Sequence, residues 1–277
     1  MPPPSATRSE RCKFCSMLLA PGPGGWRAAP ADAPEEPLLD PHLPRLWVGG
    51  LRYAVMGRLR GRVYRARRDA RITEHVLLKF GERDRLEREQ TVLAELERSE
   101  VQGAAHFTRL LPQRVDHGVA RLGMNGRDGE SFCTVLRWRS GFVHTFEDVL
   151  EVHSSGVAPE HSVWMWKRIL ELLGWVHRNG IVHGAIRPEH LILHARDHGV
   201  VLAGWSSATR GAPGSDLAAS AAVIQRVIGA EPPAPLARLL HEAGSASDAW
   251  ALKDRLDAVA REVFGPPRFV PFEMSTP

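Results

Sequence analysis

Lysine is the scarcest charged residue in this chain of 277 residues. Only four of the 36 basic residues are lysines, and the rest are arginines. Such a bias usually follows the base composition of a genome, so most of the arginines carry no functional message. The 32 acidic residues leave a net charge of only +4. A charge this small does not by itself indicate a nucleic acid or a membrane as partner.

Cysteine and long apolar runs are scarce as well. The three cysteines, Cys12, Cys15 and Cys133, are too few for a disulfide framework. No stretch reaches the roughly 18 consecutive apolar residues of a membrane-spanning helix. The N-terminus lacks the basic and apolar regions of a secretion signal. We therefore expect a globular protein in a reducing cytoplasm, with no membrane contact.

Proline is concentrated at one end, since residues 1–44 hold ten of the 21 prolines. This composition buries little apolar surface and predicts a disordered, Pro/Gly-rich tail. Cys12 and Cys15 form a CxxC pair within it, which could supply half of a zinc site. No histidine pair or second CxxC completes that site. We therefore favour two incidental thiols over a metal centre, a redox pair or a bridge between two copies.

The rest of the chain changes from strands to helices. Apolar alternation predicts five strands, with one amphipathic helix between the third and fourth: two strands within Leu51–Arg68, then His75–Phe80, helix Arg83–Arg98, and strands Phe107–Arg114 and Ser131–Trp138. Further on, helices surround two short strands: Thr145–His153, Pro159–Asn179, strands Leu191–Leu193 and Val200–Ala203, then Ser215–Ile228 and Ala246–Phe264. This order predicts an α+β fold of two lobes, residues 45–138 and 139–277, with a hinge near Trp138–Phe142.

Residues 180–193, with the sequence GIVHGAIRPEHLIL, carry the most specific pattern. They resemble the catalytic loop of protein kinases, His-Arg-Asp-Leu-Lys-Pro-Glu-Asn followed by apolar residues. His183, Pro188 and Glu189 match that pattern, and Arg187 is a conservative replacement of its lysine. The family places Asp-Phe-Gly thirteen residues after the asparagine, and here those positions hold Ala203-Gly204-Trp205.

A lysine and a glutamate upstream resemble the kinase ion pair. The stretch Val76–Lys79 resembles the Val-Ala-Ile-Lys strand, and Lys79 is one of only four lysines in the chain. Glu89, on the next predicted helix, resembles the glutamate that pairs with this lysine. The interval between them is short, so Glu87 is a rival. The resemblance implies that Lys79 pairs with Glu89 or contacts the phosphates of a nucleotide.

Two further segments extend the resemblance over about residues 46–230. Residues 61–64, which begin with Gly61, resemble the end of the glycine-rich loop, although Met56 and Arg58 replace its first two glycines. Asp216, within Ser-Asp-Leu, resembles the buried aspartate that braces the catalytic loop. Several motifs in family order are stronger support than one glycine-rich loop alone. The chain therefore resembles a degenerate, bacterial-type member of the protein-kinase-like superfamily.

The resemblance also shows which catalytic groups are missing. Ala185 stands at the position of the proton-accepting aspartate, and His190 and Ala203 stand at the positions of the magnesium ligands. Magnesium prefers hard oxygen ligands, which neither side chain offers. Loss of one electrostatic group costs about 10²–10³ in rate. The segment Ser206–Ser215, only ten residues, is also far shorter than the activation segment of active kinases. His183 is expected to anchor the loop and not to act as a base.

We therefore expect a catalytically impaired kinase-like domain, a pseudokinase, that works as a regulatory or scaffold module for protein partners. It could bind ATP weakly through Gly61, Lys79 and Glu89, and we expect no magnesium. One alternative is an atypical phosphotransferase that has rebuilt its metal site, with Glu189 and Asp197 as the nearest spare carboxylates.

A second alternative is a nucleic-acid-binding protein. Nine arginines and a single acid, Asp69, lie in residues 45–71. Arg58, Arg60 and Arg62 alternate along the chain and would therefore share one face of a strand. Only three aromatic residues lie in this region: Trp47, Tyr53 and Tyr64. So few aromatic side chains argue against stacking of bases, and we favour the pseudokinase.

Overall fold

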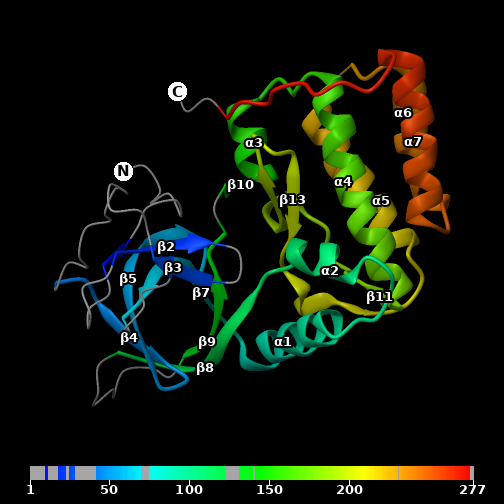
Figure 1. Cartoon of the computed structure of the whole chain (residues 1–277). Helices are drawn as coiled ribbons and strands as arrows, with labels where there is room; N and C mark the ends of the chain where they lie inside the picture. Colours follow the sequence, from blue (N-terminus) through cyan, green and yellow to red (C-terminus); the bar gives the residue numbers. More distant parts are fainter. Residues whose placement is uncertain are drawn as a thin grey trace. The chain divides into compact units, whose positions relative to one another are not determined.

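The computed structural model describes residues 10–11, 18–22, 25–28, 42–69, 75–122, 131–139, 141–229 and 231–274 (Figure 1). The α+β class predicted from the sequence is confirmed. Contacts within the chain divide it into two compact units. A barrel unit comprises residues up to 87 together with 113–140, and a helical unit comprises 88–112 together with 141–277. The boundary at residue 87 falls inside helix α1 (Arg83–Glu97).

Six antiparallel strands form a closed barrel in the first unit. Strand β4 closes it by pairing with both β5 and β8. Its buried core includes Tyr53, Val76, Leu78 and Val135. A closed sheet protects most of its strand edges from unwanted pairing. In sheet order the strands are β4 (Arg45–Val48), β5 (Leu51–Arg60), β6 (Val63–Arg68), β7 (His75–Gly81), β9 (Ser131–Arg137) and β8 (Arg114–Leu122).

The strand predicted at Phe107–Arg114 is wrong. The chain forms a short helix, α2 (Ala104–Phe107), and a 3₁₀ turn, Thr108–Leu110, before β8 begins at Arg114. Phe107 and Leu111 are buried in the core of the helical unit. A short apolar run does not by itself distinguish a strand from a buried helical turn. Strand β4, which closes the barrel, was not predicted.

The arginines of β5 do not share one face, contrary to the prediction. The register of β5 against β6 shifts between Val55 and Gly57 and again between Arg58 and Arg60. Each shift is a bulge that resets the alternation of side chains. Arg60 pairs with Val63, so Arg62 lies in the two-residue turn between β5 and β6.

The N-terminal segment 1–44 contains three short strands, although its composition predicted disorder. The strands β1 (Glu10–Arg11), β2 (Leu18–Gly22) and β3 (Gly25–Ala28) form a small antiparallel sheet. Cys12 and Cys15, and with them the proposed half of a zinc site, lie outside the described residues.

Helix α4 (Pro159–Arg178) is the centre of the helical unit. Pro159 suits the first helical turn because its ring fixes φ and its missing N–H has no partner there. One face of α4 is fully buried, with Trp166 and Trp175 among its largest side chains. Helices α5 (Gly214–Ile228) and α7 (Ala249–Phe264) pack against α4 (Figure 1). Helix α6 (Ala234–Glu242), which was not predicted, contacts α5 and α7.

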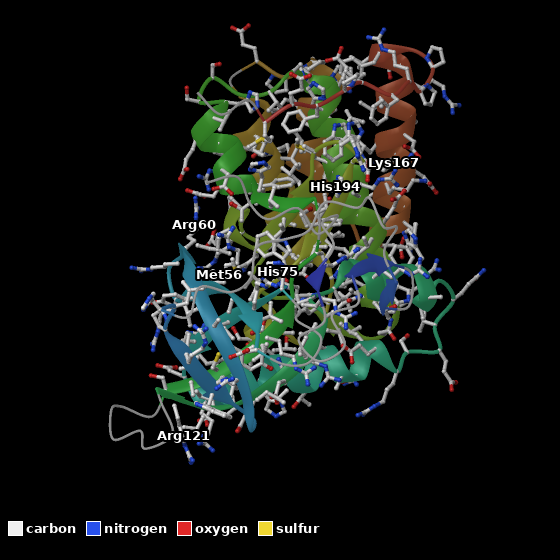
Figure 2. The ribbon with its side chains drawn as sticks, turned by 60° about the vertical axis from the view of Figure 1, so that its left-hand side comes forward. Met56, Arg60, His75, Arg121, Lys167 and His194 are labelled. Atoms are coloured by element: carbon white, nitrogen blue, oxygen red, sulfur yellow. The ribbon has the colours of Figure 1, made fainter. Side chains whose placement is uncertain are left out.

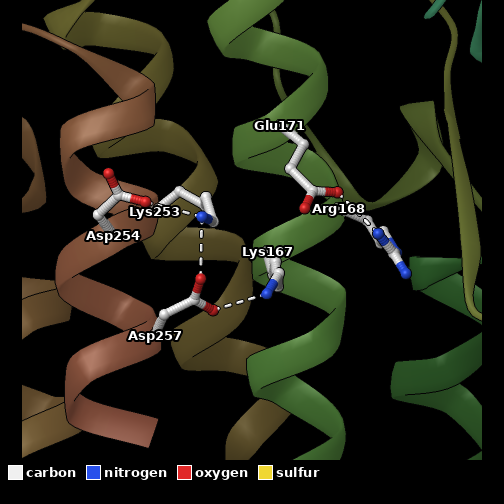
Figure 3. Close-up of polar contacts among 6 residues, drawn as sticks. All are labelled: Lys167, Arg168, Glu171, Lys253, Asp254 and Asp257. Carbon is white, nitrogen blue, oxygen red and sulfur yellow. Dashed lines mark hydrogen bonds and ion pairs between the residues drawn. The ribbon is translucent and has the colours of Figure 1, made fainter. Parts of the chain in front are cut away.

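An ion-pair network links α4 to α7 (Figure 3). Nζ of Lys167 lies 2.7 Å from Oδ1 of Asp257, and Nζ of Lys253 lies 2.9 Å from its Oδ2. Burial acts to raise the pKa of Asp257, but hydrogen bonds from both lysines outweigh it and lower that pKa. Two of the four lysines in an arginine-rich chain thus hold one carboxylate between two helices.

Small strands of the helical unit position the predicted catalytic loop. The loop follows β11 (Ile181–Val182) and passes through a 3₁₀ turn at Pro188–His190. It leads into a sheet of β10 (Phe142–Thr145), β12 (Leu191–His194) and β13 (Gly199–Leu202). β11 pairs with β14 (Thr209–Arg210). The remaining elements are α3 (Phe146–Val152) and 3₁₀ turns at Trp205–Ser207 and Ala243–Ser245. In the described part of the chain, no helix has the length and apolar character needed to cross a bilayer.

Candidate functional site

Asp216 lies behind the predicted catalytic loop and contacts its backbone. Its Oδ2 accepts hydrogen bonds from the N–H of His183 at 2.7 Å and from Nε2 of His177 at 3.1 Å, and its Oδ1 accepts one from the N–H of Gly184 at 2.9 Å. Asp216 is 1% exposed and sits in the first turn of α5. One buried carboxylate therefore ties α5 to the start of the loop.

The pKa of Asp216 lies below its ordinary value. Burial is the largest influence and acts to raise it, because a charged carboxylate loses its hydration. Hydrogen bonds from His177 and from the backbone of Gly184 and His183 act in the opposite direction and prevail. Asp216 is thus held ionised, and three of its roughly four lone-pair sites accept hydrogen bonds from His177 and the loop backbone.

His183 uses both ring nitrogens on the backbone. Nδ1 accepts a hydrogen bond from the N–H of Ala185 at 3.2 Å. Nδ1 therefore carries no proton, and Nε2 donates to the carbonyl oxygen of Ala203 at 2.9 Å. The ring is completely buried. In this neutral form His183 joins the loop to the residue that follows β13, and neither nitrogen is available for acid–base chemistry.

His190 occupies the position of a family metal ligand but makes a different contact. Its Nδ1 donates to the carbonyl oxygen of Ala185 at 2.7 Å, which closes the loop on itself. Its ring lies against Gly204, whose φ is +82°. A Cβ at Gly204 would lie 2.6 Å from ring atoms of His190. Only glycine fits there, both because of the conformation and because the imidazole fills the space.

Trp205 is the aromatic residue of the altered Ala-Gly-Trp tripeptide. It is completely buried, and its indole N–H donates to the carbonyl oxygen of Leu202 at 2.8 Å. Its ring meets that of His183 edge to face, with centroids 4.6 Å apart. Its backbone N–H donates to Oε1 of Glu89 at 3.2 Å. Glu89 is 1% exposed whereas its rival Glu87 is exposed, so Glu89 is the buried glutamate of α1.

The short segment after Trp205 runs against the loop. Gly184 stands where the family pattern has arginine, and its φ is +73°. A Cβ on Gly184 would lie 2.7 Å from the carbonyl oxygen of Ser207. The segment continues through Arg210, which forms an ion pair with Glu95. The backbone of the segment therefore fills the space that a larger side chain at Gly184 would need.

The two spare carboxylates do not replace the missing metal ligands. Glu189 is paired with Arg187 at 3.8 Å on the surface. Asp197 is paired with Arg196 and His194, in the turn between β12 and β13. His190 and Ala203 flank the opposite end of this hairpin, four residues along each strand from the His194–Gly199 pair, which is about 13 Å. Among the residues that the structure describes, no group of three or more His, Cys, Asp or Glu could hold a metal.

Lys79 lies in the barrel unit, on β7 between Val63 and Thr134 of the neighbouring strands. Residues opposite each other or two apart share a face, so Leu77 flanks Lys79 on the same face. The kinase motif has alanine at this position, and leucine adds three carbon atoms beside the lysine. Gly61, with φ +52°, forms the tight turn from β5 to β6. The pairing of Lys79 with Glu89 stays a prediction.

The sequence did not identify three residues that take part in these contacts: His177, Trp205 and Ser207. His177 follows the apolar face of α4 and gives no motif signal. Trp205 was noted only as a departure from Asp-Phe-Gly, although a large apolar residue beside a lost polar motif could have indicated burial. The approach of Ser207 to Gly184 depends on the path of the chain and leaves no pattern in the sequence.

Comparison with known proteins agrees with this geometry at the level of fold. No protein-family model and no curated protein sequence matches the chain. The structure of vaccinia related kinase 3 is similar with a TM-score of 0.62 and 14% identity, over 82% of this chain and 93% of that one. The kinase domain of BubR1 is similar with a TM-score of 0.56 and 11% identity, over 79% and 83%. The chain therefore has a protein-kinase-like fold.

Proposed function

We propose that this chain is a kinase-related domain that does not transfer phosphoryl groups and works as a binding module. The observation that carries the proposal is the altered catalytic loop. Ala185 and Ala203 end in methyl groups, and the Nδ1 of His190 is engaged with the loop backbone. The loop keeps its internal hydrogen bonds although it has lost the groups that do chemistry.

Phosphoryl transfer depends on positioning and on neutralising charge. An alanine at position 185 has no atom that could accept the proton of a substrate hydroxyl. Positions 190 and 203 carry no oxygen ligands for the metal ion that would screen the phosphates. These losses act on one transition state and do not add independently, but each removes a part that the reaction needs.

The short segment supports a binding role independently. In active kinases a long segment forms the platform for a peptide substrate. Here residues 206–213 contain a 3₁₀ turn and the strand β14, and then α5 begins at Gly214. This arrangement favours partners that dock on an outer surface, and a scaffold or regulatory role follows from that.

Lys79 is the residue through which ATP would bind. Leu77 crowds the face of β7 that carries Lys79, so we expect ATP to bind weakly or not at all. Any retained affinity would be independent of magnesium.

The test is a thermal-shift titration of the purified protein with ATP, with and without magnesium, paired with a phosphotransfer assay. A ligand that binds only the native state raises the melting temperature as its concentration passes Kd. We expect no turnover, and no shift that requires magnesium. Lys79→Met is the matched variant, because it should abolish any metal-independent shift and leave the fold intact. A magnesium-dependent shift with turnover would refute the proposal.

A further inference from the structure

The charges of the chain are segregated between the two units. The described barrel residues 42–69, 75–87, 113–122 and 131–139 contain fifteen Lys and Arg and five Asp and Glu, a net charge of +10. The described helical-unit residues 88–112, 141–229 and 231–274 contain fifteen basic and nineteen acidic residues, a net charge of −4. The overall charge of +4 conceals this contrast. The barrel alone has the charge of a unit that attracts polyanions.

An aromatic residue lies between two arginines on the outer face of this barrel. Trp47 on β4 is directly opposite Arg52 on β5 and Arg121 on β8. Its neighbours Leu46 and Val48 are buried in the barrel core, so alternation places Trp47 on the outside. Trp47 is half-buried, and both arginines are exposed. Figure 2 shows Arg121 extending outward from the end of the barrel.

Asp69 holds one of these arginines in place. Its carboxylate is 7% exposed and forms ion pairs with Nε of Arg52 at 2.8 Å and Nε of Arg45 at 3.4 Å. The guanidinium of Arg52 lies over the Trp47 ring, 5.7 Å from its centroid. The contact between Arg52 and Asp69 is made by Nε of the arginine. Arg121 forms no ion pair within the described part of the chain.

We propose that this row, Arg52–Trp47–Arg121, binds single-stranded nucleic acid: a base takes the place of the Arg52 guanidinium over the Trp47 ring, and the two arginines hold the neighbouring phosphates. Arginine suits phosphate because its planar fork presents several donors at once. Neighbouring strands lie about 4.8 Å apart, so the two arginines flank the indole at about 5 Å on either side. Stacking on an aromatic ring accepts any base, so this binding does not depend on sequence.

The row favours a nucleic acid over an acidic peptide. Carboxylates would use the two arginines but gain nothing from the indole, whereas a nucleotide uses all three side chains. The other two aromatic residues of this region face inward, since Tyr53 is fully buried and Tyr64 packs edge to face on Phe80. Trp47 is therefore the stacking platform. Arg60, the last residue of β5, extends the basic surface toward the other end of that strand (Figure 2).

This inference rests on the proposed function, because it names the partner class of the binding module. The experiment is fluorescence anisotropy of the full chain with a labelled oligothymidylate of about 15 nucleotides, at several salt concentrations. The variants are the double substitution Arg52→Gln with Arg121→Gln, then Trp47→Leu and Trp47→Phe. Arg226→Gln, an exposed arginine on α5 of the helical unit, is the matched charge control. Melting curves confirm that each variant folds.

We expect binding that weakens as salt rises. Removing two phosphate contacts should lower the slope of log affinity against log salt by about 1.4, at about 0.7 per contact. Trp47→Leu should weaken binding about tenfold or more with an unchanged slope, and Trp47→Phe should retain most of the affinity. The Arg226→Gln control should bind like the unmodified protein.

Three results would overturn the inference. They are no binding at low salt, equal binding of polyglutamate, and affinity that is insensitive to Trp47→Leu. The second and third would mean that the barrel attracts any polyanion. The phosphotransfer assay is independent of these outcomes, so turnover with magnesium would refute the proposed function while oligonucleotide binding could still hold.

Discussion

Replacing Asp216 with asparagine tests the contacts behind the loop most directly. Asparagine has the same size and shape as aspartate, but one of its two oxygens becomes an NH₂ group. Oδ2 of Asp216 serves the N–H of His183 and the ring of His177, and Oδ1 serves the N–H of Gly184. In either orientation of the amide, at least one backbone N–H therefore faces another donor.

The size of the effect follows from these contacts. A hydrogen bond to a charged group contributes about 1.5–3 kcal/mol, and a buried donor left without an acceptor costs about 1–3 kcal/mol. We expect Asp216→Asn to lower the free energy of unfolding by about 2–4 kcal/mol. Asp254→Asn is the matched control, because that side chain is 73% exposed. Its effect should stay below about 0.5 kcal/mol.

The free energy of unfolding should also depend differently on pH in the unmodified protein and in Asp216→Asn. The pKa of Asp216 is lower in the folded state than its ordinary value of 3.8, so folding favours its ionised form. The stability that this adds is complete above the ordinary pKa and is lost as pH falls through the folded pKa. Below about pH 4 the unmodified protein should therefore lose stability more steeply than Asp216→Asn.

Urea unfolding followed by tryptophan fluorescence measures both effects, at neutral pH and through the acid range. A stability change appears as a shift of the midpoint at constant slope. If Asp216→Asn unfolds at the same urea concentration as the unmodified protein, its three hydrogen bonds do not hold the loop and this account of Asp216 is wrong.

Three further outcomes are expected. Gly204→Ala should destabilise the protein by about 1–3 kcal/mol in urea unfolding, because the added Cβ would lie 2.6 Å from the ring of His190. Adding His190→Ala should restore part of the lost stability. An unchanged stability of Gly204→Ala would mean that the His190 ring moves aside easily. The pKa values of His161 and His198 are lowered, with burial as the largest cause, so folding opposes protonation of both rings. The melting temperature should therefore fall as pH drops below their ordinary pKa of 6.5. A melting temperature that stays constant from about pH 5 to 7 would contradict this. Burial raises the pKa of Cys133 to about 12, so its thiol should not react in the folded protein. With the two N-terminal cysteines changed to serine, a thiol reagent at about pH 8 should label the protein only after unfolding. Rapid labelling of the native protein would contradict a buried thiol.

Local patterns explain what the sequence could predict. The catalytic-loop resemblance rests on residues that are adjacent in the chain, and the long helix at Pro159 has a strong apolar period and clear end signals. β7 and β9 are buried runs bounded by polar residues. Each of these features is set by its own neighbourhood, so the periodicity and the motif were enough to place it.

Long-range pairing explains most of what was missed. β4 is a strand of four residues whose pairing with β8 depends on a partner some 75 residues away. The bulges in β5 reset the side-chain alternation, and nothing in the local pattern marks them. The fit of Ser207 against Gly184 likewise needs two distant segments to meet. The outward position of Trp47 could be read only once the barrel register was known.

The short segment after Trp205 has a consequence for control of this protein. Kinases commonly switch when a phosphate added to a long loop recruits an arginine and orders that loop. Here the arginine position is Gly184, and the chain passes from the 3₁₀ turn through the paired strand β14 to α5 with few residues to spare. So short and paired a segment can adopt few alternative conformations. We therefore expect that phosphorylation of this segment would not switch the protein between two conformations.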